Sequence, residues 1–84
     1  MEVEELKAIA ADKTIDARGM ACPGPLLEAK KGIGSVKVGQ VIEVKSNDKA
    51  SRLDISAWAG KVGHEYLGFL EADGHDRHFV RRKK

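Results

Sequence analysis

The chain has 84 residues, of which 42% are hydrophobic and 33% are charged, and this composition indicates one small globular domain rather than a disordered or fibrous chain. Its formal net charge of +2 is too small to indicate a nucleic-acid-binding protein. The single cysteine excludes an internal disulfide, and the apolar runs are far shorter than the roughly 20 residues that span a bilayer. A reduced thiol without a secretory signal leads us to expect a cytoplasmic protein.

The beginning of the chain is predicted to contain an extension and a first strand. Residues 1–12 have only weak helical character, so we expect an N-terminal extension that is either a short helix or a flexible arm. Residues 13–18, "KTIDAR", read as a short first strand, which Gly19 interrupts.

The next segment, "GMACPGPLLEAKK", is predicted to open a helix. Proline is tolerated in the first turn of a helix or before it, so Pro23 and Pro25 place the helix start between Cys22 and Pro25. Two lysines suit the last turn of this helix, and we expect Gly32 to end it.

A second strand and a second helix follow. The β-branched residues in 41–44 predict a strand, and the Ser-Asn-Asp sequence at 46–48 is typical of helix caps. We therefore expect a helix over about residues 49–62, ended by Gly63. Ile55, Trp58, Ala59 and Val62 should share one face of this helix, and we expect Trp58 to be a core residue.

The end of the chain has the pattern of a hairpin. The pair Asp73-Gly74 lies between two extended runs and favours a type I′ turn, so strands at about 66–72 and 75–81 should pair antiparallel. Right-handed crossovers would place both helices on one face of the sheet. We predict an α+β fold, a two-layer α/β sandwich of β-α-β-α-β-β order with a mixed four-stranded sheet. Its other face would be left to polar side chains or to a partner.

Cys22 is predicted to lie where the first helix begins. The N-terminus of a helix offers unpaired N–H groups and partial positive charge, which lower the pKa of a thiol and favour the thiolate. The neighbouring glycine and prolines favour a turn at the surface. The residues alone leave a second interpretation open, because free cysteines are often small buried core residues.

One exposed thiolate restricts the chemistry that the chain can perform. Thiol–disulfide exchange of the thioredoxin kind needs a second cysteine, and a hydrolase needs a base, while the three histidines are remote from Cys22 in sequence. A persulfide carrier needs less, and a resolving cysteine beside it would release the sulfur as sulfide. The single cysteine therefore suits a carrier.

The segment "IDARGMACPGPLLEAKK" resembles the hallmark segment of the TusA/SirA-like sulfur-carrier proteins. In that family an Asp and an Arg-Gly pair precede a Cys-Pro-x-Pro motif that opens a helix. The matching residues here are Asp16, Arg18, Gly19, Cys22, Pro23 and Pro25. The similarity continues through the second strand, the second helix and the hairpin, so we assign residues 13–84 to a TusA/SirA-like domain.

The resemblance implies a sulfur relay. Cys22 would be the catalytic residue, accepting persulfide sulfur from a cysteine desulfurase or a rhodanese-like donor and passing it to a DsrE-type or other acceptor protein. Destinations in the family include tRNA thiolation, molybdenum cofactor synthesis and sulfur oxidation. The chain would be a sulfurtransferase-type carrier rather than a self-sufficient catalyst. We expect no metal and no cofactor beyond the covalent sulfur, no direct binding of nucleic acid or membrane, and a monomer or weak dimer.

The resemblance also suggests which residues support the motif. These residues would be Arg18, Gly19, Pro23, Pro25 and Asp54. Arg18 would either favour the thiolate directly or pair with an acid such as Asp16 or Asp54 and order the loop. Asp54 would interact favourably with the dipole of the second helix.

Two functions of other classes remain as alternatives. Small α/β sandwiches of this layout can bind RNA, and the chain ends in basic residues, so a small RNA-binding or regulatory module is one. The other is a thiol redox sensor that uses the same acidic cysteine.

Overall fold

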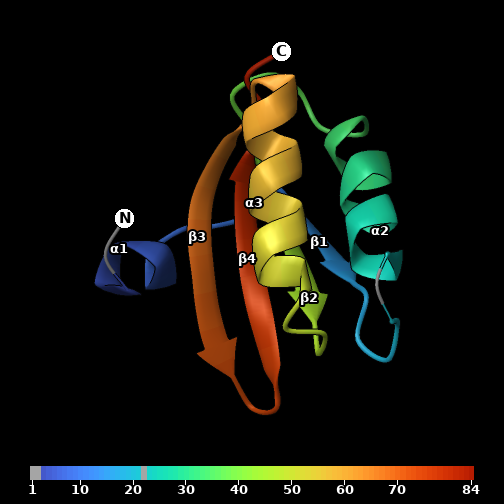
Figure 1. The fold of residues 1–84 in the computed structure, drawn as a ribbon. Coiled ribbons are helices and arrows are strands. Elements are labelled where there is room, and N and C mark those ends of the chain that lie inside the picture. The colour runs from blue at the N-terminus through green and yellow to red at the C-terminus, as the bar shows by residue number, and fades with distance from the viewer. Residues whose placement is uncertain (1–2, 22) are drawn as a thin grey trace.

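The structure is a computed structural model that describes residues 3–21 and 23–84 (Figure 1). Its helices and strands are α1 (Val3–Lys7), β1 (Lys13–Asp16), α2 (Gly24–Ile33), β2 (Val41–Ser46), α3 (Ser51–Val62), β3 (Glu65–Ala72) and β4 (His75–Arg81). Within the described ranges, every helix is too short or too polar to cross a membrane.

The strands form one mixed four-stranded sheet in the order β1-β2-β4-β3. β1 and β2 are parallel, whereas β2 and β3 both pair antiparallel with β4. α2 and α3 lie side by side against the sheet (Figure 1). The predicted α+β architecture is therefore confirmed.

The main core lies between these two helices and the sheet. It consists of Ala17, Ala29, Ile33, Val36, Ile42, Val44, Ile55, Ala59 and Val80. On α3, Ile55 and Ala59 are fully buried and Trp58 is partly buried against the same cluster, as the helical periodicity predicts. Val62, at the end of α3, is 40% exposed and does not belong to the buried cluster.

A second apolar cluster lies under α1. It consists of Leu6, Val41, Leu67, Leu70 and Phe79. Leu67 and Leu70 are three residues apart and would face opposite sides of a regular strand, but the register shift between Tyr66 and Gly68 inserts an extra residue. The expectation that this face is left to polar groups or a partner is thus wrong where α1 packs.

Two predicted boundaries in the first half of the chain need correction. β1 ends at Asp16 rather than at residue 18, because a turn begins at Ala17, whose carbonyl accepts the Met20 N–H at 3.2 Å. Gly32 does not end α2, which continues to Ile33. Gly32 is buried inside the helix, and a Cβ there would collide with Ile15 Cδ1 of β1. This glycine therefore permits close helix–strand packing.

The start of α3 also differs from the prediction. The helix begins at Ser51, its N-cap is Ala50, and it lacks a side-chain cap. Asp48 instead accepts the Ala50 N–H at 3.0 Å and so shapes the turn before the helix. The predicted end of the helix at Gly63 is confirmed.

The hairpin forms as predicted, with Ala72 opposite His75 across the Asp73-Gly74 turn. The turn type is different. A type I′ turn needs positive φ at both central residues, whereas no described non-glycine residue has positive φ and only Gly74 in this turn does.

Candidate functional site: the turn that leads into α2

The loop between β1 and α2 is anchored to the sheet at its first residue. Ala17 is fully buried, and its N–H donates to the carbonyl of Lys45 in β2 at 2.9 Å. The chain then turns over residues 17–20 with Gly19 at a φ of 85°. A positive φ at this third position of a turn favours glycine, which accounts for the Arg-Gly pair.

Arg18 forms a two-pronged ion pair with Asp16. Its Nε donates to Oδ1 at 2.9 Å and its NH2 group donates to Oδ2 at 2.8 Å, while the Arg18 backbone N–H also reaches Oδ1 at 3.1 Å. These hydrogen bonds hold the pKa of the Asp16 carboxyl well below its usual range. Both side chains are about half exposed, so the pair orders the loop more than it stabilises the fold. The interpretation that Arg18 pairs with an acid is confirmed for Asp16.

The motif prolines frame the beginning of α2. Pro23 is the exposed N-cap, its carbonyl accepts the Leu27 N–H at 3.0 Å, and Pro25 is buried in the first turn. The N–H of Gly24 donates to the carbonyl of Ala21 at 2.7 Å. The predicted helix start is therefore confirmed.

The N-terminus of α2 is open to an anion. It has no side-chain cap and no acidic residue in its first turn, as far as the described residues show. Proline at the second helical position lacks an N–H, so fewer donors remain than in an ordinary first turn. Cys22, predicted as the reactive residue, lies outside the described residues. Its neighbours Ala21 and Pro23 are exposed.

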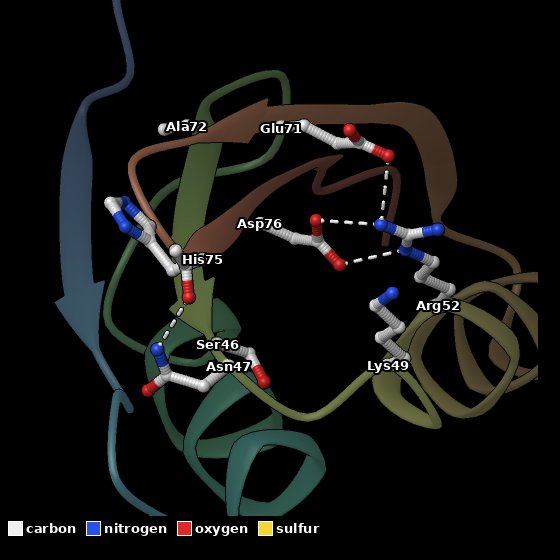
Figure 2. Close-up of a pocket in the computed structure, with 9 residues that line it drawn as sticks. Ser46, Asn47, Lys49, Arg52, Glu71, Ala72, His75 and Asp76 are labelled. Carbon is white, nitrogen blue, oxygen red and sulfur yellow. Dashed lines mark hydrogen bonds and ion pairs between the residues drawn. The ribbon is translucent and has the colours of Figure 1, made fainter.

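Asn47 connects this loop to the hairpin. Its Oδ1 accepts the Gly19 N–H at 2.7 Å, and its Nδ2 donates to the Gly74 carbonyl at 2.8 Å. Figure 2 shows the second of these hydrogen bonds among the residues that line a pocket of about 210 Å³. The sequence pattern assigned Asn47 to a helix cap, and a local pattern holds no signal for partners that lie far away in the chain.

The pocket beside Asn47 is polar and its charges are compensated. Its lining residues are Ser46, Asn47, Lys49, Arg52, Glu71, Ala72, Gly74, His75 and Asp76. Arg52 binds both oxygens of Asp76, at 2.7 and 2.9 Å, and Glu71 at 3.1 Å (Figure 2). Its hydrogen bonds lower the pKa of Asp76, and its guanidinium lies over the Phe69 ring at 4.3 Å. None of these contacts was predicted.

Asp54, the remaining predicted supporting residue, lies in the first turn of α3. A carboxylate there interacts favourably with the helix dipole, as expected. The structure thus gathers Asp16, Arg18, Gly19, Pro23 and Pro25 around one turn, and adds Asn47 to them.

The fold and this loop together define a small α+β domain in which a strand, a tight turn and a Cys-Pro-Gly-Pro segment lead into a helix. The sequence profile of the family described as sulfurtransferase TusA matches residues 13–82. The chain therefore belongs to the sulfurtransferase TusA family.

Individual relatives agree with this assignment. YrkF of Bacillus subtilis is 48% identical over 69 residues, covering 81% of this chain and 37% of YrkF. A relative from Archaeoglobus fulgidus is 43% identical over 70 residues, covering 83% of this chain and 96% of that protein. The sulfur carrier protein TusA of Allochromatium vinosum is 38% identical over 72 residues, covering 86% and 93% of the two chains.

The fold has a counterpart among solved structures. The crystal structure of a SirA-like protein from Desulfitobacterium hafniense matches with a TM-score of 0.75 and 30% sequence identity. The match covers 86% of this chain and 99% of that chain.

Proposed function

We propose that this chain is a sulfur carrier that accepts a persulfide sulfur on Cys22 and passes it to another protein. Membership of the TusA family supports the sulfur-carrier role. The observation that carries the proposal is the N-terminus of α2, which begins two residues after Cys22 in the chain and has no side-chain cap among the described residues. There, the helix dipole favours a negatively charged sulfur, although few first-turn N–H groups remain to donate to it.

The transfer needs no net oxidant or reductant. The Cys22 thiolate attacks the terminal sulfur of a donor persulfide, a new S–S bond forms on Cys22, and the donor cysteine leaves as a thiolate. In the second step an acceptor thiolate attacks the terminal sulfur on Cys22. The Cys22–sulfur bond breaks, and Cys22 leaves as a thiolate. A helix N-terminus assists this step, since a thiol with a lower pKa is the better leaving group.

The absence of a second cysteine in the sequence protects the carried sulfur. A neighbouring thiol would attack the Cys22 persulfide, form a disulfide and release sulfide. In this chain the persulfide can be resolved only by a thiol from another molecule, which directs the sulfur to an acceptor protein.

Membership of the family supports sulfur-relay partners in general, and we propose their classes. The donor would be a cysteine desulfurase or a rhodanese-like protein in the cytoplasm, and the acceptor a DsrE-type or other sulfur-accepting protein. Sulfur would pass to tRNA thiolation, molybdenum cofactor synthesis or sulfur oxidation. The carrier would act as a monomer or weak dimer, with the covalent sulfur as its only cofactor.

Mass spectrometry of the intact protein tests the proposal. After incubation with a cysteine desulfurase and cysteine, or with a rhodanese and thiosulfate, the protein should gain about 32 Da, one sulfur atom, and lose it on reduction. The Cys22→Ser variant is the matched control and should gain nothing. If the native protein stays unmodified with both donors, the chain is not a persulfide carrier.

A further inference from the structure

One side chain outside the Cys-Pro-Gly-Pro motif joins two loops at the same end of the sheet. Asn47 accepts a hydrogen bond from Gly19, 28 residues earlier, and donates one to Gly74, 27 residues later. These partners fix the orientation of the amide, because a backbone N–H can only donate and a carbonyl can only accept. Asparagine satisfies both partners, an ionised aspartate would satisfy only Gly19, and alanine would satisfy neither.

The bond to Gly19 anchors the turn that leads to Cys22. The Arg18–Asp16 contacts join residues two apart, so they shape the loop locally but do not fix it to the rest of the molecule. Ala17 is anchored to β2, and beyond Ala17 the described part of the loop makes one further long-range hydrogen bond, from Gly19 to Asn47. The position of the turn relative to the β2–α3 connection therefore depends on this amide.

We propose that Asn47 is a positioning residue for Cys22. By holding the turn at Gly19, three residues before Cys22 in the chain, it restrains the segment that carries the thiol into α2. The second bond, to Gly74, also connects the amide to the hairpin turn, but the hold on the turn before Cys22 comes from the bond to Gly19. The inference rests on the proposed role of Cys22 as the sulfur-accepting residue.

Alkylation of Cys22 by iodoacetamide across a range of pH tests this role in the full chain. Cys22 is the only cysteine, so the reaction reports its thiolate alone. For Asn47→Ala we expect the midpoint of the pH–rate curve to rise by roughly half a pH unit. We also expect sulfur acceptance from a desulfurase to slow by about tenfold, because a small displacement of a reacting group is costly.

Asn47→Asp is the variant that separates positioning from a merely structural role. Its carboxylate can still accept the Gly19 N–H but loses the bond to Gly74. Measured at about 1 M salt, where the Debye length is only about 3 Å and screens the added charge, its pH midpoint should lie close to that of the native protein. Hydrogen exchange of the Gly19 amide should be fast in Asn47→Ala and remain slow in Asn47→Asp.

Lys49→Ala, which alters the same pocket without touching the loop, is the matched control and should behave as the native protein does. The proposal is overturned if Asn47→Ala keeps the native pH midpoint and rate, whatever its melting temperature. It is also overturned if Asn47→Asp or Lys49→Ala shifts the midpoint as much as Asn47→Ala does. Because alkylation does not involve sulfur transfer, failure of sulfur loading in the native protein would remove the carrier function without deciding the role of Asn47.

Discussion

The poorly exposed carboxylates of the sheet are paired with arginines. Glu43 accepts hydrogen bonds from Arg77 at 2.9 and 3.1 Å, and Asp76 accepts two from Arg52. Each carboxylate side chain is only 7% exposed, while its arginine is about one-third exposed. Removing one member of such a pair would leave a poorly solvated charge without its partner. The pairs therefore order the sheet faces.

His78 is the buried polar residue that differs from this pattern. Its Nδ1 lies 2.9 Å from the hydroxyl of Tyr66, whereas its Nε2 has no hydrogen-bond partner among the described residues. The side chain is fully buried in β4, and this burial lowers the pKa of His78 to about 4. His78 is therefore neutral at pH 7.

Protonation of His78 should destabilise the fold in a defined pH window. The folded-state pKa of about 4 lies below the ordinary value of 6.5, so the unfolded chain binds this proton more readily. The contribution of neutral His78 to the free energy of unfolding is complete above pH 6.5 and is lost as the pH falls from 6.5 towards 4. Because a single proton is bound, the free energy of unfolding should fall by roughly 2 to 3 kcal/mol over this pH range. Urea unfolding at several pH values measures this loss.

The variant His78→Leu isolates this contribution. It should be less stable at pH 7, because Tyr66 loses its partner, but its free energy of unfolding should depend less on pH between 6.5 and 4. His64, whose pKa is also lowered by burial, is present in both proteins and cancels in the comparison. If the free energies of unfolding of the native protein and the variant change with pH in parallel, His78 is not the titrating group.

At the scale of secondary-structure elements, two helical glycines have opposite roles. Gly32 in α2 leaves no room for a Cβ next to Ile15, whereas nothing lies within 4 Å of a Cβ at Gly60 in α3. We expect Gly32→Ala to lower the free energy of unfolding by about 1 to 3 kcal/mol through overpacking. Gly60→Ala, its matched control, should raise it by up to about 1 kcal/mol through helix propensity.

Urea unfolding of the two variants measures both effects. Helix propensity acts in the same direction at both positions, so the difference between them reports the contact between α2 and β1. If Gly32→Ala stabilises the protein as Gly60→Ala does, α2 can move away from β1 without cost and the packing role of Gly32 is wrong.

These elements show which features a sequence can predict. Local signals located the start of α2 at its prolines, the end of α3 at Gly63 and the hairpin at Asp73-Gly74, because each of these depends on backbone preferences of a few adjacent residues. Gly32 was misread as a helix stop, since its role is set by Ile15 on another element.

The candidate site could likewise be predicted only where it depends on residues that are close together in the sequence. The Cys-Pro-Gly-Pro segment and the Arg18–Asp16 pair lie within a short stretch of sequence; the segment was predicted, and the pair was one of the alternatives considered for Arg18. Asn47 and the Arg52–Asp76 pair were not predicted, because their partners lie 24 to 28 residues away and meet only in the folded chain.

At the scale of the whole molecule, the sheet is covered on both faces. α2 and α3 cover one face, and α1 covers part of the other, beside β3 (Figure 1). A helix of five residues is not stable by itself in water, so α1 depends on its contacts with the sheet. Leu6 supplies the main contact, since it is 2% exposed and belongs to the second apolar cluster.

Leu6→Ala should therefore lower the free energy of unfolding by about 2 kcal/mol, at the low end for a buried leucine because a short terminal helix can detach instead of leaving a cavity. Leu53→Ala is the matched control, because Leu53 is 73% exposed on α3 and its truncation should change stability by less than about 0.5 kcal/mol. Detachment of α1 would also uncover Leu67, Leu70 and Phe79, so Leu6→Ala should bind more of a fluorescent apolar dye at native pH. Equal stabilities for the two variants, with no added dye binding, would mean that α1 contributes nothing to the fold and that the second cluster is held by the sheet alone.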